Sequence, residues 1–122
     1  MTDQATFLNA AVCGLFRGSP RELLELAQET EAAFGRERAR EIRRGARTLD
    51  VDILLFGDRV VDEGSELLIP HPGLTERKFA LIPLLELHPE ARDPRTGSLL
   101  FESLAVLPPQ GIYYADLAPY TS

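Results

Sequence analysis

Short apolar runs separated by turn residues dominate the chain and predict several strands. The first, Phe7 to Phe16, is almost continuously apolar and is typical of a buried strand. A second run predicts a strand over 50–56, and shorter strands are predicted at 59–61 and 67–69. Gly57-Asp58 predicts the turn that separates two of them.

Two segments have the features of helices. Ser19-Pro-Arg-Glu22 has the residues of a capping box, with proline at the first helical position. It predicts a helix to about residue 34, with Gly35 near its end. A second helix is predicted from about Thr75, with Pro83 ending it or starting a second turn. Residues 36–47 lack a sustained apolar period, and we predict a mobile loop there.

The length of 122 residues fits one compact domain, and 44% hydrophobic and 26% charged residues are ordinary for a soluble globular protein. We expect a single domain over 1–122, with its core at about 4–90. The segment 91–122 begins in a stretch rich in proline and glycine and contains only short apolar pieces, so it is interpreted as peripheral.

Charge and cysteine content narrow the partners and the location. A formal charge of -6 argues against a general nucleic-acid binder, and no apolar run approaches the length of a membrane span. The single cysteine, Cys13, lies in an apolar stretch and is expected to be a buried thiol. A chain with one cysteine agrees with a reducing, cytoplasmic location.

The strongest chemical signal is a pair of carboxylates at the start of the second apolar run. In a strand, Asp50 and Asp52 would lie on one face, with Val51 and Ile53 on the other. Paired carboxylates suit hard divalent cations such as Mg²⁺, which nucleotide enzymes share with phosphates. Just upstream, six of the twelve residues in 36–47 are arginine, a residue that binds phosphate oxygens well. Together these features indicate metal-assisted phosphoryl chemistry.

Isolated residues give weaker signals. Gln28 and Glu31 fall on one helical stripe with Leu24, which is typical of a polar helix face but also allows a shared ligand. Asn9 lies in an otherwise apolar strand, where a buried amide needs hydrogen-bond partners. His71 stands between two prolines and has the features of a turn histidine.

Several enzyme families carry an Asp-x-Asp pair on a strand. In haloacid-dehalogenase-type phosphatases the pair follows the apolar run, whereas Asp50 and Asp52 precede it. Polymerase-beta-type nucleotidyltransferases have the same order as this chain, but their Gly-Ser loop before the pair has no counterpart in Gly35-Arg36 or Gly45-Ala46. That family remains an alternative.

The longer resemblance is to 6-hydroxymethyl-7,8-dihydropterin pyrophosphokinases. Gly45 to Gly57 is similar to that family's signature, and Phe7 to Val12 resembles its pterin-contacting strand. Gln28 to Arg38 is similar to its helix and arginine loop, and Ile69 to Phe79 resembles its later ATP- and pterin-binding segment. Glu66 falls where some members carry a basic ATP contact.

The resemblance implies an α+β, ferredoxin-like fold, with an antiparallel-rich sheet and helices on one side. It implies a cytoplasmic transferase of folate biosynthesis that passes pyrophosphate from ATP to the pterin and releases AMP. Its implied site residues are two Mg²⁺ ligands, Asp50 and Asp52; ATP ligands Gln28, Glu31, Arg36, Arg38, Arg47, His71 and Arg77; and pterin contacts Phe7, Asn9 and Phe79. Arg36 and Arg47 would assist the two aspartates in catalysis.

One difference from the family is large. Its members begin with a strand, a helix and a second strand, whereas this chain starts almost at the strand predicted from Phe7. We therefore expect a fold that is N-terminally truncated relative to the family, with an exposed sheet edge that promotes self-association. A non-catalytic remnant that binds nucleotide or a partner protein is the alternative to an enzyme.

Overall fold

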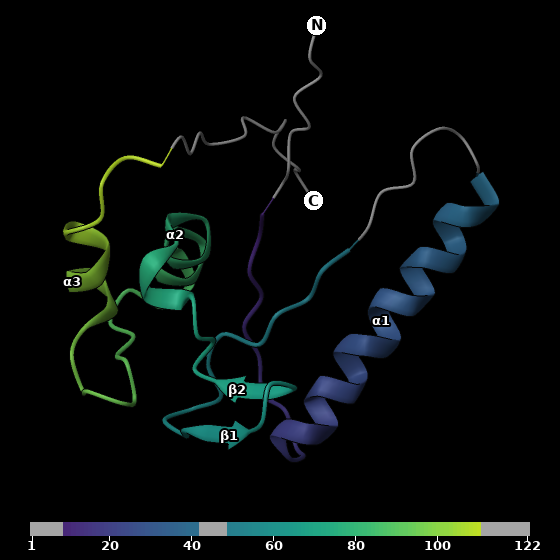
Figure 1. The fold of residues 1–122 in the computed structure, drawn as a ribbon, viewed down its shortest axis with the longest axis horizontal. Helices are drawn as coiled ribbons and strands as arrows, with labels where there is room; N and C mark the ends of the chain where they lie inside the picture. The colour runs from purple at the N-terminus through teal and green to yellow at the C-terminus, as the bar shows by residue number, and fades with distance from the viewer. Residues whose placement is uncertain (1–8, 42–48, 111–122) are drawn as a thin grey trace, which may run out of the picture. The chain divides into compact units, whose positions relative to one another are not determined.

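The computed structural model describes residues 9–41 and 49–110 (Figure 1). They form an α+β arrangement, as the sequence predicted, with helices and a two-stranded antiparallel sheet. The chain divides into two compact units. We call Gly14–Pro72 with Asp93–Gly97 the hairpin unit, and Met1–Cys13 with Gly73–Arg92 and Ser98–Ser122 the helical unit.

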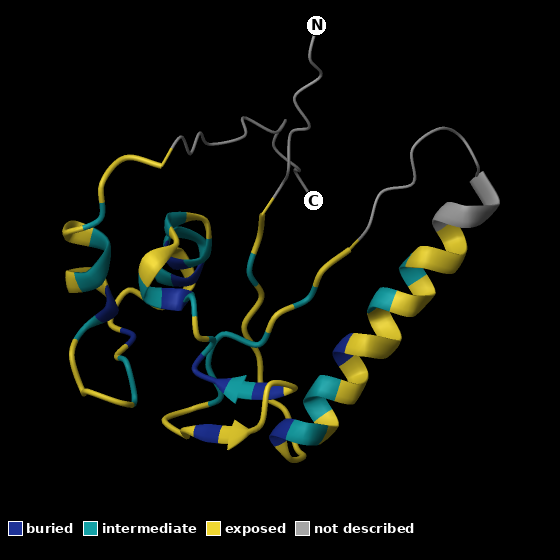
Figure 2. Cartoon of the chain, in the orientation of Figure 1, coloured by how far each residue is buried: buried dark blue, intermediate teal, exposed yellow. Residues whose placement is uncertain are grey.

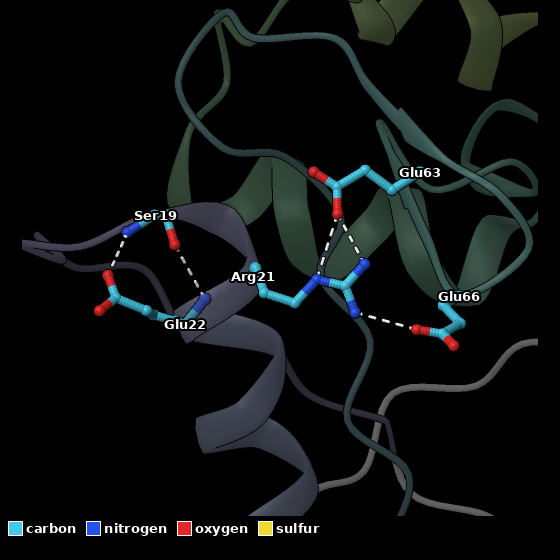
Figure 3. Close-up of polar contacts among 5 residues, drawn as sticks. All are labelled: Ser19, Arg21, Glu22, Glu63 and Glu66. Atoms are coloured by element: carbon cyan, nitrogen blue, oxygen red, sulfur yellow. Dashed lines mark hydrogen bonds and ion pairs between the residues drawn. The ribbon is translucent and has the colours of Figure 1, made fainter.

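Helix α1, Pro20–Glu41, begins at the predicted capping box. The backbone N–H of Ser19 donates to Oε1 of Glu22 at 2.7 Å, and the N–H of Glu22 donates to Oγ of Ser19 at 3.1 Å (Figure 3). The predicted end near Gly35 is wrong, because the helix continues through it. A glycine costs a helix only about 1 kcal/mol relative to alanine. The strong helix formers of residues 36–41 offset that cost.

The same finding corrects the predicted arginine loop. Residues 36–41 are helical rather than a loop, and 42–48 lie outside the described residues. Most of the side chains described for α1 are exposed (Figure 2). Among them, Pro20 and Ala27 are buried.

Two short strands form a hairpin. Strand β1, Val61–Glu63, pairs antiparallel with β2, Leu67–Ile69, so that Val61 lies opposite Ile69. Gly64 adopts a positive φ of 75° in the turn between them, a conformation that favours glycine. The strand predicted at 67–69 is confirmed, whereas the one predicted at 59–61 lies two residues later in the chain.

The core of the hairpin unit forms around this hairpin. The side chains of Val61, Leu67 and Ile69 are buried together. Leu24 from α1 and two residues of the 50–56 segment, Ile53 and Phe56, pack against them. This packing explains how a hairpin with strands of three residues each is stable, since an isolated two-stranded hairpin has only marginal stability without a packed face.

The strand predicted over 7–16 is wrong for its described part. Residues 9–16 are irregular, and Cys13, expected to be buried, is exposed. Val12 and Leu15 are 96% and 102% exposed. A strand needs a neighbouring backbone to satisfy its hydrogen bonds, and none pairs with these residues among the strands described.

The segment 50–56 is also irregular rather than a strand. One bond ties it to the residues after β2: the N–H of His71 donates to the carbonyl of Leu54 at 3.0 Å. This single bond is not a ladder, and the predicted alternation fails because Leu54 and Leu55 are both half-buried.

The helical unit has its own apolar core. A 3₁₀ turn, η1, Leu74–Glu76, leads into α2, Lys78–Leu87, and a loop connects it to α3, Leu100–Ala105. Pro83 lies inside α2 rather than at its end. The buried apolar side chains of this unit are Leu74, Leu81, Leu84, Ala91 and Leu100.

The interpretation of residues 91–122 as peripheral is therefore wrong for the start of that segment. Leu100 is completely buried, and its N–H donates to the carbonyl of Ala91 at 2.9 Å. In the described part of the chain, no helix has the length and apolar character needed to cross a membrane.

Candidate active site

The hairpin unit brings together Asp52 and His71. The turn after β2 places Nε2 of His71 at 3.8 Å from Oδ2 of Asp52, which is an ion pair when the imidazole is protonated. The His71 side chain is 22% exposed and that of Asp52 is 60% exposed. The backbone bond from His71 to Leu54 fixes this approach. The carboxylate of Asp52 therefore faces solvent, and the less exposed imidazole of His71 lies next to it.

A cavity of about 200 Å³ lies beside this pair. Its polar lining consists of Asp52, Ser65, Glu66 and His71. Its apolar lining comes from α1, the 50–56 segment and the hairpin, and comprises Leu24, Val51, Ile53, Leu67, Leu68 and Pro72. The cavity therefore presents both polar and apolar side chains, and its volume suits part of a ligand such as one ring system.

Glu31 connects α1 to the aspartate segment. Its Oε2 accepts a hydrogen bond from the backbone N–H of Val51 at 2.6 Å. Val51 stands between Asp50 and Asp52, so the bond restrains the backbone of both. Gln28, almost one turn earlier on α1, is exposed.

The chemistry of the aspartate pair fits Mg²⁺. Asp50 and Asp52 are both exposed and offer carboxylate oxygens, the ligands that this ion prefers. Among residues 9–41 and 49–110, no three His, Cys, Asp or Glu side chains gather closely enough to hold a metal. Mg²⁺ in nucleotide enzymes is commonly held by one or two carboxylates and completed by water and substrate phosphates. The pair therefore fits an ion that is shared with a nucleotide.

An arginine that sequence reasoning missed fixes one wall of the cavity. Arg21 on α1 places Nη2 at 2.6 Å from Oε1 of Glu63 and Nη1 at 2.9 Å from Oε1 of Glu66 (Figure 3). Its hydrogen bonds to Glu63 and then Glu66 raise the pKa of Arg21 above the ordinary arginine value. The pairs span 42 and 45 positions, so no local spacing could reveal them.

The helical unit brings together two other predicted site residues. The guanidinium of Arg77 lies over the ring of Phe79, 5.7 Å from its centroid. Both side chains are exposed at the start of α2. A Cβ on Gly73 would lie 2.8 Å from Nε of Arg77, so the glycine allows this close approach.

Gln110 holds the same turn and was also missed. Its Oε1 accepts from the N–H of Lys78 at 2.8 Å, and its Nε2 donates to the carbonyl of Glu76 at 3.1 Å. The two bonds bracket Arg77 in the sequence and position its backbone. Gln110 follows two prolines in the segment interpreted as peripheral, and nothing in that pattern indicates the contact.

The remaining predicted residues are less well placed. Asn9 is exposed rather than buried, so its amide is not forced to find a protein partner. Arg36 is exposed on α1, and Arg38 lies in the same helix, with its side chain outside the described residues. Phe7 and Arg47 lie outside the described residues altogether.

Comparison with known proteins identifies the family. A model of the 7,8-dihydro-6-hydroxymethylpterin-pyrophosphokinase (HPPK) family matches residues 1–89. The chain is 45% identical over 96 residues to the 2-amino-4-hydroxy-6-hydroxymethyldihydropteridine pyrophosphokinase of Bacillus subtilis, covering 79% of this chain and 56% of that protein. It is 44% identical over 112 residues to the protein of that name from Methylorubrum extorquens, covering 91% of this chain and 67% of that protein.

A longer relative shows the same similarity. The folic acid synthesis protein fol1 of Schizosaccharomyces pombe is 46% identical over 111 residues, which make up 90% of this chain and 15% of that protein. The chain thus spans little more than half of the Bacillus subtilis relative and about two thirds of the Methylorubrum extorquens relative. These matches favour the pyrophosphokinase family over the nucleotidyltransferase alternative. The chain belongs to the 7,8-dihydro-6-hydroxymethylpterin-pyrophosphokinase family.

Proposed function

We propose that this protein transfers a pyrophosphoryl group from ATP to 6-hydroxymethyl-7,8-dihydropterin. The pterin hydroxyl oxygen attacks the β-phosphorus, the bond from that phosphorus to the oxygen shared with the α-phosphate breaks, and AMP leaves. The hydroxyl proton is lost to solvent. Family membership supports the reaction, and the observation that carries it for this chain is the cavity beside Asp52 and His71.

In this proposal the cavity takes the purine ring of ATP. Its apolar lining suits the faces of a flat ring, and Gln28 on the neighbouring helix offers an amide to the nucleotide. His71 contacts the phosphates from the rim of the cavity. The arginines Arg36, Arg38, Arg47 and Arg77 bind the triphosphate through their forked donors.

Asp50 and Asp52 hold two Mg²⁺ ions in the proposed complex. Mg²⁺ bound by these carboxylates would supply charge neutralisation at the phosphates. The protein itself positions the substrates, which is most of what phosphoryl transfer requires from side chains. Phe79 stacks against the pterin with Phe7, and Asn9 offers its amide to the pterin edge.

The proposed location and partners follow from the proposed reaction and from the charge of the chain. We propose a single functional domain in the cytoplasm, with ATP and the pterin as its partners and with neither nucleic acid nor membrane. A net charge of -6 disfavours phosphate-rich polymers in particular.

The test is a measurement of products. The chain is mixed with ATP, MgCl₂ and 6-hydroxymethyl-7,8-dihydropterin, and AMP and ADP are separated by chromatography. We expect AMP and the pterin diphosphate in equal amounts. A variant with Asp50→Ala and Asp52→Ala should release none, whereas Asp62→Ala, at an exposed position on β1, should match the unsubstituted chain. ADP as the nucleotide product, or AMP that is unaffected by the double substitution, would reject the proposal.

A further inference from the structure

We infer that Glu31 is a positioning residue that holds the Asp50–Asp52 segment on α1, rather than the ATP ligand that the family resemblance implies. The inference rests on the proposed function only for what the two aspartates bind. The contact itself, from Oε2 of Glu31 to the N–H of Val51, is described without reference to any ligand.

The hydrogen bond has the geometry of a strong one. Its length of 2.6 Å is short for an N–H donor, as expected when the acceptor is an ionised carboxylate. Both ends are partly buried, so water competes less for the donor and the acceptor. The donor belongs to the peptide between the two aspartates, which makes Glu31 the residue best placed to fix both together.

The aspartate segment depends on this contact. The segment 50–56 forms no strand ladder. The backbone bond from the N–H of His71 to the carbonyl of Leu54 holds its middle. The N-terminal end, at Asp50 to Asp52, lies beyond that bond. Glu31 supplies the hydrogen bond that a neighbouring strand would otherwise provide.

The supporting helix is itself well held. Ala27, one turn before Glu31, is buried, and Leu24, nearly one turn earlier again, packs on the hairpin core. Arg21 joins the first turn of α1 to both glutamates of the hairpin. Glu31 therefore projects from a helix that is held against the hairpin, so it can set the position of a backbone segment that forms no strand ladder.

A positioning role and a ligand role make different demands on the side chain. Accepting an N–H needs only an oxygen, which glutamine also provides. Binding a metal or opposing a cation needs the negative charge. Glu31→Gln should therefore preserve positioning but abolish a ligand role, whereas Glu31→Ala removes both.

The experiment measures Mn²⁺ affinity by electron paramagnetic resonance in the presence of α,β-methylene-ATP. We expect Glu31→Ala to weaken Mn²⁺ binding about 10- to 100-fold, the usual cost of losing a residue that orients a metal ligand. Glu31→Gln should stay within about fivefold of the unsubstituted chain. Glu29→Ala, an exposed glutamate on the same helix, should change nothing.

Amide exchange measured by NMR on the metal-free chain provides a second readout. The Val51 amide should exchange faster in Glu31→Ala than in Glu31→Gln, while the amides of the hairpin stay protected in both. Equal losses of Mn²⁺ affinity in the Gln and Ala variants, or unchanged affinity and Val51 exchange in Glu31→Ala, would overturn the inference. The expected pattern in a chain that releases no AMP would instead reject the proposed function and leave the inference standing.

Discussion

Nη2 of Arg21 lies 2.6 Å from Oε1 of Glu63, and Nε of the same guanidinium lies 3.1 Å from that oxygen. The two bonds join the first turn of α1 to β1 across 42 positions of the sequence. The helix and the hairpin both contribute side chains to the lining of the cavity beside Asp52. The same guanidinium also pairs with Glu66, at the turn of the hairpin.

We predict that Arg21→Ala lowers the melting temperature of the chain, because it removes both charge-assisted contacts. The loss should shrink as salt rises from about 0.1 M to about 1 M, since exposed ion pairs are screened. Because the pKa of Arg21 is raised, the contribution that these contacts make at neutral pH is kept as the pH rises and is lost only in strong alkali. Arg17→Ala, at an exposed arginine just before the helix, serves as the control. Equal shifts in both variants would contradict the assignment.

Removing the hydroxyl of Ser19, which caps α1, and that of Thr30, within α1, should affect the free energy of unfolding differently. Ser19→Ala removes half of the capping box and should lower the free energy of unfolding by about 1 kcal/mol. Thr30→Ala removes a bond to the Leu26 carbonyl in the middle of the helix, where alanine has the higher helix propensity, and should be neutral or slightly stabilising. Urea unfolding followed by circular dichroism measures both, and a larger loss in Thr30→Ala would be inconsistent with the cap.

Leu100 should behave as a core residue despite its place in a segment with only short apolar pieces. Leu100→Ala should cost about 2–5 kcal/mol, because the side chain is completely buried and leaves a cavity. The adjacent Phe101 is 59% exposed, and its replacement by alanine should cost much less. Denaturant unfolding of the two variants decides between a core and a peripheral role, since similar costs would contradict the packing.

His71 and His88 should separate nucleotide binding from stability. His71 lines the cavity, and His71→Ala should weaken ATP binding by about tenfold or more if its imidazole contacts phosphate. His88 is exposed, and His88→Ala should leave ATP affinity unchanged. Titration calorimetry with α,β-methylene-ATP gives both affinities. Unchanged binding in His71→Ala would remove this histidine from the proposed site.

The exposed apolar residues before α1 should promote self-association. Val12 and Leu15 are almost fully exposed, and among residues 9–41 and 49–110 no further strand pairs with the hairpin. We expect light scattering to report a mass above 13.5 kDa that rises with protein concentration. Leu15→Glu should lower it without affecting folding, because that side chain makes little contact. A concentration-independent monomer would be incompatible with this prediction.

Local signals were the most predictable part of the fold. The capping box at Ser19 and Glu22 and the strand at 67–69 each depend on a few adjacent residues, and the structure contains both. The 50–56 segment shows the limit of such reasoning. An apolar run defines a strand only when another backbone supplies its hydrogen bonds, and a single chain sequence does not specify that partner.

The candidate site divides in the same way. Residue types and order predicted a role for Asp52, and the family resemblance added His71; their separation of 3.8 Å is consistent with a shared site. The residues that hold the candidate residues within each unit were not predictable: Arg21 contacts glutamates more than forty positions away, and Gln110 contacts a turn more than thirty positions earlier. Such pairs arise from packing and leave no periodic trace in the sequence.

The passage of α1 through Gly35 has a consequence for the arginines beyond it. Helix α1 contacts β1 through Arg21 and the aspartate segment through Glu31, and both residues precede Gly35. Glycine gains more backbone freedom on unwinding than any other residue, so unwinding from the C-terminal end costs least there. The turn that carries Arg36 can therefore fray and re-form while the wall of the cavity stays in place.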